Sequence, residues 1–150
     1  MQKTTVVAVG KLKERFWKDA CAEYLKRLSA YTDITVREVP DSTIEREEAA
    51  VLAALEKLPA DAHIILLDIQ GKQASSMQLA QKLETLAVQG VSHVTFVIGG
   101  SDGVTPAVAT RCNERLSFGP ITLPHNLARV VLLEQIYRAH KIIRGEPYHK

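Results

Sequence analysis

Apolar residues along the chain follow two alternating patterns. Short runs rich in Val, Ile, Leu or Phe are bounded by polar residues, Gly or Pro, which is typical of strands. The longer segments between these runs have the apolar periodicity that is typical of helices. The predicted strands span residues 4–9, 34–39, 64–68, 94–99 and, more briefly, 116–118.

Sequence signals at the segment ends place the helices. Glu45 supplies an acidic residue to the first turn of the second helix, and glycines at positions 90 and 145 end the third and the last. The predicted helices span residues 14–30, 42 or 43 to before 59, 76–88, a short segment from 105–106 onward, and 124–144.

This alternation of apolar strands and helices predicts the α/β class, with a parallel sheet covered by helices on both faces. The chain has 150 residues, which suits one domain spanning the whole length. Folding at that size buries roughly 68–70% of the surface of the unfolded chain, so a core forms without disulfides or metal. No internal repeat, linker or low-complexity segment divides the sequence.

The last predicted helix has apolar residues on more than one face. A helix that packs on one sheet needs a single apolar stripe, so the excess indicates either deep burial within one chain or a second protein surface. We favour a homodimer interface, because little else covers a helix at the end of a small domain. The residues concerned are Leu127, Val130, Val131, Leu132, Leu133, Ile136, Tyr137, Ile142 and Ile143.

The formal net charge of +2 is too small to establish a nucleic-acid partner. Its distribution is uneven, since residues 111–150 hold seven Lys and Arg against three acidic residues. That excess is compatible with phosphate contacts and equally with a solvated helix face.

The two cysteines, Cys21 and Cys112, show no Cys-x-x-Cys or Cys/His spacing, so a disulfide framework or a zinc site is not expected. We expect both to be small buried side chains in a reducing cytoplasm. The apolar run near the first residues is too short for a signal peptide or a membrane span. The five histidines lack metal-ligand spacing, and no metal is expected.

Three glycine-bearing segments follow three predicted strands, over residues 66–76, 97–103 and 117–125. Ligands of open parallel sheets bind beyond the carboxyl ends of the strands, and glycine lets the backbone approach them closely. None of the segments has the glycine spacing of a P-loop or a dinucleotide fingerprint. Ser75 and Ser76 are better suited to helix capping than to nucleophilic chemistry, and Asp68 suits either a ligand contact or a turn.

Several segments together resemble a known family. The tail TLPHNLARVVLLEQIYRAHKIIRGEPYHK, with LDIQGKQASS, FVIGGSDGV, VAVGKLKE and EYLKRL, is similar to the small bacterial SPOUT-class methyltransferases of the RlmH type. The resemblance implies S-adenosyl-L-methionine as cofactor and N3 of a pseudouridine in 23S rRNA as target. It also implies a homodimer and an α/β knot, in which the C-terminal segment forms a deep trefoil.

The resemblance also implies the site residues. The base that removes the N3 proton would be His149, although a terminal residue can equally have no fixed role. His125 would order the loop beside the cofactor. The cofactor would contact Leu67, Gly99, Phe118, Gly119, Pro120, Ile121, Thr122 and Leu123. The RNA would contact Arg138, Arg144, Tyr148 and Lys150, and Arg138 can alternatively pair with Glu134 one turn earlier.

Two alternatives remain open on the sequence alone. A SPOUT enzyme can act on tRNA or on another rRNA site, and a flavodoxin-like module can bind nucleotides or RNA without catalysis. The modest charge favours recognition of a shaped particle, such as the large subunit or the assembled ribosome, over a purely electrostatic grip on extended RNA.

Overall fold

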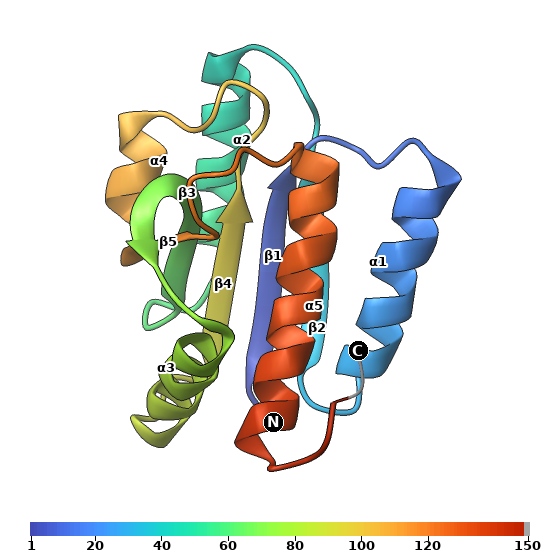
Figure 1. Ribbon diagram of the computed structural model, residues 1–150. Coiled ribbons are helices and arrows are strands. Elements are labelled where there is room, and N and C mark those ends of the chain that lie inside the picture. The colour runs from blue at the N-terminus through green and yellow to red at the C-terminus, as the bar shows by residue number, and fades with distance from the viewer. Residues whose placement is uncertain (149–150) are drawn as a thin grey trace.

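A computed structural model describes residues 1–148 as a single parallel sheet with helices on both faces (Figure 1), which confirms the predicted fold class. The strand order is β2-β1-β4-β3-β5, and every pairing is parallel. The strands are β1 (Lys3–Val9), β2 (Asp33–Val39), β3 (His63–Gln73), β4 (His93–Ile98) and β5 (Glu114–Ser117).

The helices divide the core into two layers. The side chains of α1, α3 and α5 pack with Val6, Ile65 and Phe96 on one face, and those of α2 and α4 pack with Val7 and Val97 on the other. The helices are α1 (Arg15–Leu28), α2 (Ile44–Glu56), α3 (Ser76–Val88), α4 (Pro106–Arg111) and α5 (His125–Ile143).

The predicted caps are present at the helix ends. Ser75 accepts a hydrogen bond from the backbone of Gln78, whose side chain accepts one from the Ser75 backbone, so the pair forms a capping box. Gly90 and Gly145 have φ of +86° and +64°, the left-handed conformation that glycine adopts without strain. The amide after each glycine donates back to the last helical turn, as in a Schellman motif.

The last helix, α5, lies on the sheet between α1 and α3 (Figure 1). This central position buries Leu132, Leu133 and Ile136 completely within one chain. Deep burial in the monomer therefore accounts for part of the apolar excess that the sequence shows. The half-buried Val130, Val131 and Tyr137 remain available to a second copy, and the homodimer stays a prediction.

Strand β3 continues beyond the predicted end at Asp68, so the prediction of a loop over the whole of 66–76 was wrong. The register shifts between Leu67 and Lys72, and both residues pair with Leu116 of β5. Gly71 permits this close approach, because a Cβ on it would lie 2.8 Å from the Arg115 carbonyl carbon. Only the first part of the segment, around residues 66–69, therefore faces a ligand site.

Burial separates the two cysteines. Cys21 is buried as predicted, whereas Cys112 at the end of α4 is only half-buried. Burial raises the pKa of both thiols. Along residues 1–148 no helix has the length and apolar character needed to cross a membrane.

Candidate functional site

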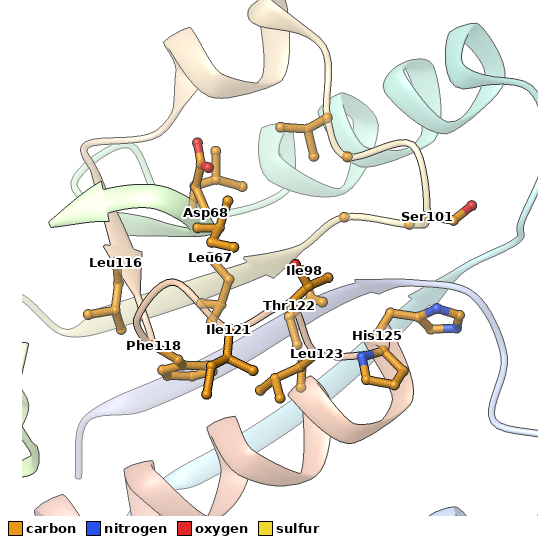
Figure 2. A pocket seen from close by; sticks show the side chains of 18 of the residues that line it. Leu67, Asp68, Ile98, Ser101, Leu116, Phe118, Ile121, Thr122, Leu123 and His125 are labelled. Carbon is orange, nitrogen blue, oxygen red and sulfur yellow. The ribbon is translucent and has the colours of Figure 1, made fainter. Parts of the chain in front are cut away.

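The three glycine-bearing segments contribute to one cavity, which lies beside residues 66–69 of β3 and beyond the carboxyl ends of β4 and β5 (Figure 2). Its volume of about 910 Å³ lies in the range of small-molecule and cofactor sites. Apolar side chains and glycine backbone make up most of the wall. The lining residues are Leu66, Leu67, Asp68, Ile69, Ile98, Gly99, Gly100, Ser101, Gly103, Val104, Leu116, Phe118, Gly119, Ile121, Thr122, Leu123, Pro124, His125 and Ala128.

Leu67 and Asp68 form the wall contributed by β3. The Asp68 carboxylate accepts a hydrogen bond from the Gln70 amide (3.0 Å) and one from the Arg115 guanidinium (3.2 Å). These contacts support the turn interpretation of Asp68, although the residue also borders the cavity.

The segment after β4 forms a tight glycine turn. The Gly103 amide donates to the Gly100 carbonyl (3.0 Å), and Gly103 has a φ of +74°. A Cβ on Gly99 would lie 2.9 Å from Val104 Cγ1 and 3.0 Å from the Gly103 carbonyl oxygen, so no larger residue fits without movement. The turn consequently brings backbone N–H and C=O groups to the cavity wall.

The segment after β5 closes the cavity from the α5 side. The Ser117 hydroxyl donates to the Ile69 carbonyl (3.0 Å) and accepts from the Gly119 amide (3.0 Å), which ties this segment to the end of β3. Figure 2 shows Phe118 and Leu123 around the same space as Leu67.

Seven of the eight predicted cofactor contacts line the cavity, and Pro120 does not. Pro120 is exposed at a bend in the segment. Sequence reasoning missed Ile98, Leu116, Val104 and Ala128, which also line the space. Ile98 and Leu116 belong to predicted strands, and only the position of a strand end relative to its neighbours makes such residues part of a site.

A buried arginine fixes the start of α5 beside the cavity. Arg129 is 2% exposed and donates to the Gly10 carbonyl (2.8 Å) and to Glu38 Oε2 (2.6 Å). His125, one turn earlier, lies against Gly10, where a Cβ would be 3.1 Å from its Nε2. Arg129 is therefore not part of the basic surface with which the sequence grouped it; it joins α5 to β1 and β2.

The predicted RNA contacts lie at the other end of α5. Arg138 donates to Glu134 through two nitrogens (3.1 and 2.8 Å), which confirms the predicted pairing, and it lies 4.3 Å from the Tyr148 ring centroid. Arg144 is exposed, with its guanidinium 4.6 Å from the Tyr31 ring. Burial, followed by hydrogen bonds with Glu134 and Tyr24, raises the pKa of Tyr148.

The cavity borders the first turn of α5, and the tail follows the last turn. Because α5 has 19 residues, its length of about 28 Å separates the cavity from the tail. Within one chain, Arg138, Arg144 and Tyr148 are thus not brought to the cavity. His149 and Lys150 lie outside the described residues. Among residues 1–148, no group of three or more His, Cys, Asp and Glu side chains is placed to hold a metal ion.

The cavity suits a nucleoside-type cofactor. Flat apolar rings fit between Leu67, Ile98 and Phe118, and the glycine turns offer backbone groups to the polar edge of an adenine. A parallel α/β sheet with such a site at the carboxyl ends of its strands is typical of proteins that bind nucleotide-like cofactors.

Comparison with known proteins identifies the family. Residues 2–149 match the family described as "Predicted SPOUT methyltransferase", and the chain belongs to this family. It is therefore an S-adenosyl-L-methionine-dependent methyltransferase.

Two curated relatives cover nearly the whole chain. A Listeria monocytogenes protein is 52% identical over 158 residues, covering 97% of this chain and 98% of the relative. A Bacillus cytotoxicus protein is 50% identical over 156 residues, with the same two coverages. Both bear the name "Ribosomal RNA large subunit methyltransferase H".

A solved structure of a probable methylase family protein from Haemophilus influenzae shares the fold. Its TM-score is 0.58 at 14% identity, and the match covers 99% of this chain and 71% of that one.

Proposed function

We propose that the enzyme methylates N3 of a pseudouridine in 23S rRNA, acting on the large subunit within the assembled ribosome in the cytoplasm. The observation that carries the proposal is the identity of 50–52% with two relatives named as large-subunit rRNA methyltransferases, over 97% of the chain. The family match over residues 2–149 spans the cavity segments and the tail, so the substrate as well as the cofactor is expected to be shared.

The cofactor would be held by the cavity wall. Leu67 and Phe118 would pack on the adenine, Gly99 and Gly119 would offer backbone groups, and Ile121 to Leu123 would cover it from the α5 side. When bound, S-adenosyl-L-methionine supplies a methyl group on a sulfonium centre. The chain's own contribution is to hold the donor and the target nitrogen in line and close together.

The target nitrogen carries a proton that a base has to accept. N3 of a uracil-type ring is an imide nitrogen, and an imidazole has a pKa suited to taking its proton near neutral pH. We assign this role to His149. Tyr148 would stack on a base, and Arg138, Arg144 and Lys150 would contact phosphates.

A second copy is needed for the tail to reach the cavity. Tyr148 and the cavity lie at opposite ends of α5, and a rigid helix of 19 residues keeps them about 28 Å apart within one chain. Two α5 helices packed antiparallel would bring the tail of each chain to the cavity of the other. The half-buried apolar side chains along α5 support this arrangement.

The family knot remains a prediction with local support. Leu116 pairs with Leu67 and with Lys72, and Ser117 donates to Ile69, so β5 contacts both arms of the 67–72 bend.

Single-turnover methylation of unmodified ribosomes tests the role of His149. The His149→Ala variant should bind the cofactor normally and transfer methyl groups 10²- to 10⁴-fold more slowly, the usual contribution of a general base. Thermal shift with S-adenosyl-L-methionine is the control for an intact cavity. An unchanged rate would remove His149 from the mechanism.

Mapping the product tests the substrate. Mass spectrometry of 23S rRNA incubated with the enzyme should locate the new methyl group on a pseudouridine. A methyl group on tRNA, or at another rRNA position, would contradict the proposed target while leaving the family assignment intact.

A further inference from the structure

An exposed basic and aromatic segment lies between β1 and the first turns of α1. Four cations, Lys11, Lys13, Arg15 and Lys18, flank Phe16 in the sequence, with Glu14 as the one acid of the segment, and we refer to the four cations and Phe16 as the 11–18 patch. All five are exposed, and Phe16 retains 62% of its surface accessibility. Among the ion pairs of residues 1–148, none involves these four cations. The patch is a local exception in a region where acids outnumber bases, since the first 110 residues hold fourteen acidic residues against twelve Lys and Arg.

The patch lies at the same end of the sheet as the cofactor cavity. Its first residue directly follows Gly10, and Gly10 is in contact with His125, which lines the cavity. Figure 1 shows the connection from β1 to α1 beside the start of α5. A polymer whose target nucleotide enters the cavity would therefore pass close to the patch.

Helix stability does not explain these residues. Glu14 at the N-cap makes no side-chain capping bond, and the first turn of α1 holds no acid. Arg15 and Lys18 instead place positive charge at the positive end of the helix dipole, which is unfavourable by a few tenths of a kcal/mol per residue. Residues that oppose local stability are expected where function requires them.

Core packing does not explain Phe16 either. The neighbouring Trp17 packs against the core between the sheet and α1, whereas Phe16 points away from it. The two rings are 4.9 Å apart with an angle of 54° between their planes, so Trp17 supports Phe16 in an outward position. One flat face on the surface, flanked by cations, is the arrangement that binds unpaired nucleotides.

We propose that the 11–18 patch binds single-stranded RNA next to the target nucleotide, with the cations contacting phosphates and Phe16 stacking on a base. The inference rests on the proposed function, because it places an additional part of the rRNA on the enzyme. It also assigns RNA contacts to the chain that forms the cavity, in addition to those expected of the tail.

The charge arm of the test measures binding to purified unmethylated 70S ribosomes over a series of salt concentrations. The triple variant Lys11→Gln, Lys13→Gln, Arg15→Gln should bind at least about ten-fold more weakly at low salt. Its plot of log affinity against log salt should be shallower by about 2, because each phosphate contact with single strands contributes about 0.7.

The matched control removes three exposed cations from the α2–α4 side, as Arg46→Gln, Lys57→Gln, Arg111→Gln. It changes the net charge equally, and it should leave the salt slope unchanged. Equal losses in both triple variants would mean that only net charge matters, which would overturn the inference.

The aromatic arm separates stacking from apolar protein contact. Phe16→Leu keeps the apolar bulk and should weaken ribosome binding about five- to hundred-fold, the range for one stacked base, whereas Phe16→Trp should bind like the wild type. Light scattering gives the mass of each variant. If Phe16→Leu binds normally, Phe16 does not stack on RNA and the inference fails. If Phe16→Ala changes the oligomeric state, the patch is an interface between copies, and the inference fails as well.

The wild-type reaction keeps the two proposals distinguishable. If the wild type methylates 23S rRNA while both arms show no change, the patch inference fails alone. If the wild type transfers no methyl group to 23S rRNA, the proposed function fails first and the patch assignment falls with it.

Discussion

At the scale of single residues, Arg129 connects the fold to the site. Its guanidinium is almost fully buried, and it links the Gly10 carbonyl at the end of β1, Glu38 of β2 and the first turns of α5. Its Nε is buried without a hydrogen-bond partner among the described atoms, so the arrangement is not optimised for stability alone. Pro124 and His125, at the start of the same helix, border the cavity.

The Arg129→Met variant should therefore lose both stability and cofactor affinity. Two charge-assisted hydrogen bonds disappear, which predicts a loss of about 2–3 kcal/mol in the free energy of unfolding. Urea denaturation measures this loss, and calorimetric titration with S-adenosyl-L-methionine measures the affinity. Glu38→Gln is the control, because it removes charge from a partly exposed partner and leaves the Gly10 contact in place. Wild-type cofactor affinity in Arg129→Met would show that the contacts of Arg129 with Gly10 and Glu38 stabilise the fold and do not affect the site.

Gly99 offers a second residue-scale prediction. The Gly99→Ala methyl group would lie 2.9–3.0 Å from Val104 and Gly103, so the turn after β4 has to open. Overpacking of this kind costs about 1–3 kcal/mol. The loss of binding free energy for the cofactor should exceed the loss of unfolding free energy, because the displaced backbone lines the cavity. Asp102→Ala, at an exposed position of the same turn that does not line the cavity, should bind the cofactor normally.

The sequence predicted the cavity residues better than the residues that hold them in place. Glycine and the ends of apolar runs indicated three segments around one site, because strand ends in a parallel sheet meet at one edge. The particular residues within them, Leu67, Gly99 and 118–123, came from the family resemblance. A buried arginine has no signature in a single sequence, so Arg129 was counted with the basic tail. The cations of residues 11–18 likewise did not stand out, because acids outnumber Lys and Arg over the first 110 residues.

At the scale of elements, periodicity and helix-end signals were enough to predict all ten helices and strands among residues 1–148, with most bounds correct to within a few residues. The extension of β3 to Gln73 was not predictable, because it depends on the shifted pairing with β5. The glycine caps at Gly90 and Gly145 explain why α3 and α5 end where they do. The position of α5 between α1 and α3 could not be predicted either, because an apolar face in the sequence does not show which elements it packs against.

The buried histidine of α5 predicts a pH dependence. Burial, followed by the positive charge of Arg144, lowers the pKa of His140 below its ordinary 6.5, and the ring stacks on Tyr31. The unfolded chain then binds a proton that the folded chain does not, so stability falls as the pH decreases from about 6.5 toward the folded pKa. Above pH 7 this contribution is constant.

Thermal unfolding at pH 7 and pH 5 checks this expectation. The His140→Phe variant keeps a ring against Tyr31 but cannot bind a proton, so its Tm should fall less than that of the wild type. His93, whose pKa is also lowered mainly by burial, is present in both proteins and contributes equally. Identical falls in Tm would contradict a neutral buried His140.

At the scale of the whole molecule, the cavity and the described part of the tail lie at opposite ends of α5. One end supplies a preorganised cavity, and the other carries Arg138, Arg144 and Tyr148. If both ends take part in the reaction, as proposed, two chains would combine to form one active site. The 11–18 patch adds a substrate contact on the side of the cavity itself, so the expected RNA surface is composite.

The central claim is that residues 66–69 of β3 and the segments after β4 and β5 form the binding site for the methyl donor. Calorimetric titration with S-adenosyl-L-methionine tests it most directly when the cavity is filled by Leu67→Trp. The control, Thr85→Trp, places the same ring in a separate surface hollow beside α3. We expect S-adenosyl-L-methionine binding to be lost in Leu67→Trp and kept in Thr85→Trp. Undiminished binding by a folded Leu67→Trp variant would contradict it.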